Sequence, residues 1–129
     1  MELNEEKRLL QLKKYENIGQ QFFDQIIEYY NNEEVLDNND IIERKNTTLR
    51  FKYARRQYLL ELSYNNKNGY GQILVYTARK GTEFWDNPEF IIKENSQIFF
   101  DISGNIYFNS IAHQYPNKCA GDIIKETTK

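Results

Sequence analysis

Basic and aromatic residues are interleaved over positions 44–58. Arginine guanidinium groups bind phosphate and carboxylate through paired hydrogen bonds, and aromatic faces stack on nucleobases. The pattern therefore predicts a site for an anionic ligand: a nucleotide, a nucleic-acid single strand or an acidic protein surface. The candidate residues are Arg50, Lys52, Tyr53, Arg55, Arg56 and Tyr58, joined by Arg79 if the strand end that carries it lies nearby.

The same bases have a plainer interpretation, because they adjoin an acidic segment. Residues 28–43 contain six acids and no base, whereas residues 44–56 contain six bases and no acid. Lys and Arg on the wet face of a sheet keep it soluble and block edge-to-edge pairing, and neighbouring acids can neutralise them within the fold. Both interpretations stay open at this point. The acids are Glu28, Glu33, Glu34, Asp37, Asp40 and Glu43.

A second candidate is the pair His113 and Cys119, the single His and the single Cys of the chain. A Cys nucleophile needs a base and a lowered thiol pKa, both of which a histidine supplies, and Asp101 or Asp122 could orient the ring. The alternative is a free thiol packed as a small hydrophobe, so the enzymatic hypothesis ranks last. Two such ligands are too few for structural zinc, and we predict no metal and no cofactor.

The segment that begins at Asp37 starts like a calcium loop but departs from the pattern. Ile42 stands at the sixth position, where Gly is required, and Thr48 at the twelfth, where Glu is required. We therefore interpret these residues as turn and capping chemistry.

Composition restricts the class of protein. The chain has 129 residues, a formal charge of −2, 15% aromatic residues and ten Tyr. Near-neutral charge argues against general DNA binding, and no apolar run is long enough to cross a membrane. The opening residues lack the apolar core of a secretory signal, and one Cys suits a reducing compartment, so we expect a cytoplasmic protein.

Residues 4–31 have the spacing of a long amphipathic helix. Apolar residues recur in steps of three and four from Leu12 to Tyr30, and Asn4 is a plausible N-cap. Apolar content is thinner before Tyr15, so the first turns should project beyond the core. Gly19 inside this helix predicts the close approach of another backbone, such as a strand that crosses the helix.

Residues 32–46 are polar apart from two apolar pairs, and predict a short helix or an irregular connection. From Thr47 the apolar period becomes two, which is typical of half-buried strands. Asn68-Gly69 predicts a hairpin turn and Gly71 a bulge, while Pro88 predicts an edge strand, a strand with a bulge or two short pieces over 83–92. Residues 98–108 resemble a second hairpin, and 113–129 a tail.

These elements predict one domain over 1–129, of class α+β. A long N-terminal helix would pack on an antiparallel, largely meander sheet of five or six strands within 47–111. Such a sheet leaves one face wet, where spare Tyr and Arg residues would lie.

Two functions follow from this arrangement. The first is a small non-enzymatic interaction protein of the inhibitor, immunity or adaptor type, such as phages and mobile elements of AT-rich bacteria encode. Its partner would be another protein or a second copy of the chain, since Tyr is favoured at interfaces. The alternative is an anion- or nucleotide-binding module that uses the basic-aromatic strand 50–58. Neither function involves a membrane.

Overall fold

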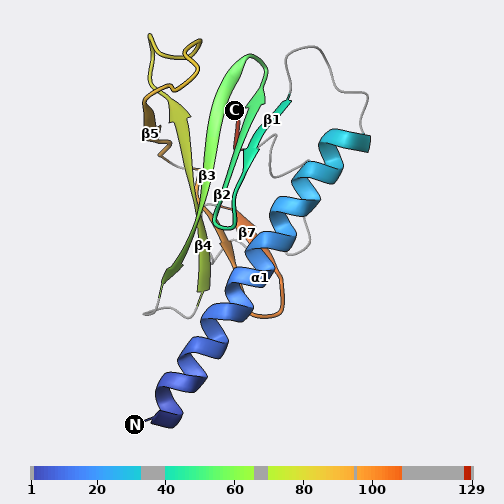
Figure 1. The fold of residues 1–129 in the computed structure, drawn as a ribbon, viewed down its shortest axis with the longest axis vertical. Helices are drawn as coiled ribbons and strands as arrows, with labels where there is room; N and C mark the ends of the chain where they lie inside the picture. Colours follow the sequence, from blue (N-terminus) through green and yellow to red (C-terminus); the bar gives the residue numbers. More distant parts are fainter. Residues whose placement is uncertain (1, 33–39, 66–69, 95, 109–126, 129) are drawn as a thin grey trace.

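The computed structural model describes residues 2–32, 40–65, 70–94, 96–108 and 127–128. These residues form one helix and one seven-stranded sheet (Figure 1). The elements are α1 (Glu2–Asn32), β1 (Asp40–Arg44), β2 (Thr48–Tyr53), β3 (Arg56–Asn65), β4 (Tyr70–Ala78), β5 (Phe90–Ile92), β6 (Ile98–Phe100) and β7 (Ile106–Phe108). The prediction of an α+β fold, with an N-terminal helix on an antiparallel meander sheet, is confirmed.

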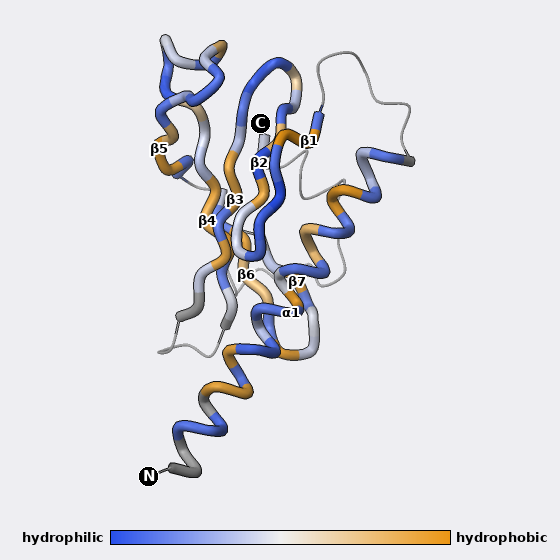
Figure 2. Tube along the Cα trace, viewed as in Figure 1, coloured by the Kyte–Doolittle hydropathy of each residue, from blue (hydrophilic) through white to orange (hydrophobic). Residues whose placement is uncertain are grey.

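Helix α1 begins at Glu2, two residues before the predicted N-cap, and ends at Asn32. Hydrophobic and hydrophilic stretches alternate along it, because one stripe faces the sheet and the rest faces solvent (Figure 2). Its N-terminal turns project past the sheet, as expected (Figure 1). Leu9 and Leu10, in this projecting part, are 64% and 61% exposed. None of the helical residues described here forms a segment apolar enough to span a membrane.

The sheet order is β1-β2-β3-β4-β6-β7, and all pairs are antiparallel. The short strand β5 also pairs with β4, opposite residues 76–78, while β6 pairs opposite residues 71–73. Strands β5 and β6 thus pair with different parts of the same edge region of the long strand β4. Side chains alternate between the core face, which α1 covers, and the opposite face, which we call the outer face.

The interpretation of 32–46 as a short helix or irregular connection is wrong for residues 40–44, which form β1. Ile41 lies opposite Phe51 and packs against the core, so tertiary pairing outweighs the polar surroundings of this apolar pair. A register irregularity follows between Ile41 and Glu43. Residues 33–39 lie outside the described residues.

One further expectation is wrong, and another is confirmed in part. Gly71 is not a bulge, because the β3–β4 register runs unbroken from Tyr58 to Asn65. A Cβ on Gly71 would lie 2.1 Å from the Phe100 ring, so the glycine makes room for that ring. In the segment 83–92, Phe90–Ile92 forms a short edge strand that pairs with β4, as one predicted alternative has it, while residues 83–89 belong to the β4–β5 loop.

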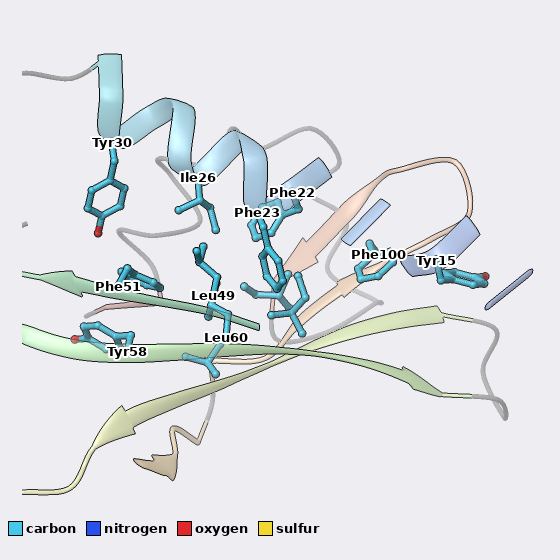
Figure 3. Close-up of a cluster of buried hydrophobic side chains, with 13 residues drawn as sticks. Tyr15, Phe22, Phe23, Ile26, Tyr30, Leu49, Phe51, Tyr58, Leu60 and Phe100 are labelled. Carbon is cyan, nitrogen blue, oxygen red and sulfur yellow. The ribbon is translucent and has the colours of Figure 1, made fainter. Parts of the chain in front are cut away.

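The core lies between α1 and the sheet (Figure 3). An aromatic series crosses it from helix to sheet: Tyr30 meets Phe51 edge-on, and Phe51 stacks on Tyr58 with centroids 5.5 Å apart. The Tyr30 hydroxyl donates to the Lys52 carbonyl at 3.1 Å. Burial of apolar side chains from both sides docks α1 on the sheet. The other buried residues that the helix contributes to this core are Tyr15, Phe22, Phe23 and Ile26.

The β6–β7 turn is built around Asp101. This carboxylate accepts hydrogen bonds from the Ser103 and Asn105 amides, the Asn105 side chain and the Tyr107 hydroxyl, at 2.9–3.0 Å. Partial burial alone would raise the pKa of Asp101, but these hydrogen bonds outweigh it and hold the pKa below its usual value. Asp101 therefore acts within the turn.

Candidate binding groove

A groove of about 510 Å³ lies on the outer face, at one end of the sheet. The β2–β3 turn and the β4–β5 loop lie at this end, away from the N-terminus of α1 (Figure 1). The turn and the loop lie at the same end because β2 and β4 are both antiparallel to β3, so these two strands run in the same direction and end side by side. The lining residues are Ile42, Arg50, Lys52, Arg55, Gln57, Glu83, Phe84, Trp85 and Asp86.

The floor of the groove follows from the two-residue period of β2 and β3. Leu49 and Phe51 face the core, so Arg50 and Lys52 face outward, and Gln57 lies opposite Lys52. Ile42, at the register irregularity of β1, adds an apolar side chain to the wall. Such irregularities re-aim a side chain at a sheet edge.

Gln57 fixes the β4–β5 loop over the floor. Its side chain is 5% exposed, and its amide nitrogen donates to the carbonyls of Glu83 at 3.1 Å and Trp85 at 2.9 Å. Its amide oxygen accepts from Arg50 Nε at 3.2 Å. One buried amide thus satisfies two loop carbonyls and one guanidinium, which holds the loop in one position.

Arg50 completes this attachment. Its guanidinium also donates to the Asp86 carbonyl, and it lies over the Phe90 ring with its Cζ 5.5 Å from the ring centroid. The protein itself therefore occupies much of the binding capacity of Arg50.

The base of the same loop is closed by a separate set of contacts. Arg79 Nε lies 2.6 Å from Glu89 Oε2. The buried Thr82 hydroxyl donates to the Arg79 carbonyl at 2.8 Å and accepts from the Glu89 amide at 3.2 Å. Arg79 thus closes the loop and does not line the groove.

The loop tip presents two aromatic side chains to solvent. Phe84 is 87% exposed and Trp85 is 53% exposed. Because the loop is tied down at its base and by Gln57, this exposure belongs to an ordered segment. Ile91 and Ile92 of the adjoining β5 are each 48% exposed, and the strand register places Ile92 on the outer face and Ile91 on the opposite one.

The β2–β3 turn brings Arg55 to the groove in an unusual backbone conformation. Ala54 and Arg55 have φ of 51° and 70°. A two-residue hairpin loop of this kind normally uses Asn-Gly, because side chains at positive φ crowd the backbone. Among the described residues, the Arg55 and Lys52 side chains have no hydrogen-bonding or ion-pair partner.

Only some of the residues predicted from the basic-aromatic segment lie in the groove. It brings Arg50, Lys52 and Arg55 together in the groove. Tyr53 and Arg56 face the core side of the sheet, and Tyr58 is buried at 1% exposure, so neither tyrosine supplies an aromatic face to the groove. Burial raises the pKa of Tyr58, against the lowering effect of nearby Arg56. His113 and Cys119 lie outside the described residues.

Phe84 and Trp85 provide the aromatic wall instead, and sequence reasoning did not assign them to the site. The available signal was an aromatic pair, including the single Trp, directly before the turn residues Asp86-Asn87-Pro88. Glu83 and Asp86 also line the groove, so its three bases face two acids. The acids of β1 lie close as well: Asp40 pairs with Lys52 and Glu43 with Arg50 in the strand register.

Comparison with protein-family models, curated proteins and solved structures gives no match for this chain.

Proposed function

We propose that this chain is a small non-enzymatic interaction protein, of the inhibitor, immunity or adaptor type, that binds a protein partner at the groove. The observation that carries the proposal is the ordered β4–β5 loop, which holds Phe84 and Trp85 exposed beside three bases. Trp and Arg are enriched among the residues that dominate protein–protein binding energy.

The rigidity of the loop supports the same function. Exposed aromatic surface adds binding energy, but ordering a loose loop on binding would offset that gain. Gln57 and the Arg79–Glu89 pair hold the loop in place before a partner arrives. A partner would therefore meet a surface that is already organised.

Affinity capture with matched variants tests this proposal. Phe84→Ser and Trp85→Ser remove the exposed aromatic surface, while Ile102→Ser removes an apolar side chain that is 45% exposed near the β6–β7 turn. We expect purified wild-type and I102S bait to retain the same partner from cells that produce the protein, and F84S and W85S to lose it. An identical captured set for all four baits would contradict the proposal.

Sedimentation of the same four proteins tests whether the partner is a second copy. A homo-oligomer that W85S dissociates, and that I102S leaves intact, would identify this chain as its own partner.

A second candidate is the anion- or nucleotide-binding module. Convergence of Arg50, Lys52 and Arg55 beside Trp85 favours it, since guanidinium groups and an aromatic face recognise nucleotides. A thermal-shift series with nucleoside mono-, di- and triphosphates tests it. A rise in melting temperature that R55G abolishes would support it, and a flat series would eliminate it.

A further inference from the structure

The cations of the groove are not equivalent. Arg50 is engaged with Gln57, the Asp86 carbonyl and the Phe90 ring. Lys52 and Arg55 have no such partners among the described residues, although both line the groove. The charge available to a ligand therefore lies with these two side chains, on the side of the groove formed by β2 and the β2–β3 turn.

Arg55 occupies its position against the preference of the backbone. At φ of 70°, glycine would avoid the crowding that an arginine side chain causes. Strained residues of this kind are concentrated at binding sites, where the side chain is needed in that place. The guanidinium of Arg55 is the one feature that glycine could not supply.

The other lining residues indicate what kind of anion fits. Glu83 and Asp86 line the same groove and would repel a ligand with more negative charge than the two available cations neutralise, such as a nucleoside triphosphate or a nucleic-acid backbone. One or two carboxylates match the two available cations. The apolar lining residues Ile42, Phe84 and Trp85 suit an apolar side chain of the ligand rather than a sugar or a phosphate.

We propose that the groove binds an acidic peptide segment of the protein partner, with its carboxylate on Arg55 and Lys52 and an adjacent apolar side chain against Trp85. This inference rests on the function proposed above and names the chemistry that the site recognises. The Ala54-Arg55 turn then holds the recognition guanidinium in place at the expense of fold stability.

The single Trp of the chain gives a direct measurement, because intrinsic tryptophan fluorescence reports on Trp85 alone. The probe is an eight-residue peptide with two adjacent glutamates flanked by leucines. The control peptide has glutamine in place of both glutamates. We expect the glutamate peptide to bind about twofold to fivefold more tightly than the glutamine peptide, as one partly exposed charge pair would give. Inorganic phosphate and ATP, titrated in parallel, should leave the fluorescence unchanged.

Two variants of the turn separate recognition from folding. Ala54→Asn keeps Arg55 and puts a residue that tolerates positive φ in place of alanine, whereas Arg55→Gly relieves the strain and removes the guanidinium. Both should raise the melting temperature by about 3–6 °C. A54N should keep the preference for the glutamate peptide, and R55G should bind both peptides equally weakly.

Several outcomes would overturn the inference: equal binding of the two peptides, a flat titration with both, a response to phosphate or ATP as strong as to the peptide, or an R55G protein that keeps the preference. Partner capture by W85S and R55G distinguishes failure of this inference from failure of the proposed function. If W85S loses the captured partner and R55G retains it fully, the interaction function stands and acidic recognition fails. If neither variant changes capture, both fail.

Discussion

Single residues decide how closely α1 approaches the sheet, and Gly19 is the clearest case. A Cβ at this position would lie 2.1 Å from Leu62 Cδ1, far inside van der Waals contact. The neighbour is therefore a side chain of β3 and not the crossing backbone that the sequence led us to expect. Leu62 packs against the core, so a methyl group at position 19 would push the Leu62 side chain out of its present packing.

We predict that Gly19→Ala destabilises the fold by about 1–3 kcal/mol in urea denaturation, because overpacking outweighs the roughly 1 kcal/mol that alanine gains in a helix. Asn17→Ala, at an exposed position of the same helix, should instead stabilise it slightly. In a Leu62→Ala background the penalty of G19A should disappear. A G19A protein as stable as N17A would show that Leu62 does not limit the helix.

At the scale of elements, the groove depends on how the β4–β5 loop is attached to the sheet. The loop contributes four of the lining residues, and its tip is held to β3 by the buried amide of Gln57. A leucine of similar volume at this position would leave two carbonyls and one guanidinium without their partner, and unsatisfied buried polar groups are costly.

We predict that Gln57→Leu lowers the free energy of unfolding by about 2–3 kcal/mol. The loop should also gain motion, so the fluorescence anisotropy of Trp85 should fall. Gln72→Leu, on the outer face of β4, serves as the control and should leave the anisotropy unchanged. Unchanged anisotropy in Q57L would mean that the Arg79–Glu89 closure alone orders the loop.

At the scale of the whole molecule, α1 and the sheet are joined by the aromatic series through Tyr30. Burial is the main cause that raises the pKa of Tyr30 far above its ordinary value, and the neighbouring tyrosines Tyr53, Tyr29 and Tyr58 and the acid Asp40 add to it. The folded protein therefore retains a proton that the unfolded chain releases near pH 10. Stability from this group is complete below pH 10 and is lost as the pH rises further.

We predict that the free energy of unfolding falls above pH 10 with a slope of up to about 1.4 kcal/mol per pH unit from Tyr30. Tyr30→Phe should cost about 1 kcal/mol at neutral pH, through the hydrogen bond to the Lys52 carbonyl, and should fall less steeply above pH 10. Adding Tyr58→Phe, at a second tyrosine whose pKa burial raises, should flatten the profile further. Parallel profiles for wild type and Y30F between pH 9 and 11 would contradict this account.

The fold class was largely predictable because local periodicity is a property of the chain. Steps of three and four placed the helix within two residues of its observed ends, and the two-residue apolar period from Thr47 onward indicated the strands β2, β3 and β4. Strand β1 was not predicted, because Asp40–Arg44 contains only one apolar pair and shows no alternation. Its pairing with β2 and the packing of Ile41 against the core stabilise it instead.

The sequence by itself determined that Arg50 and Lys52 share the outer face, since alternation in a strand allows nothing else. Only the tertiary structure decided which aromatic residues meet them. Tyr53 and Tyr58 are close to Arg50 and Lys52 in sequence, but both face the core. Phe84 and Trp85 come from a loop about thirty residues further along the chain, which Gln57 holds over the groove. Periodicity fixes a side chain's face within one element, but its neighbours across the groove depend on long-range packing that no local pattern encodes.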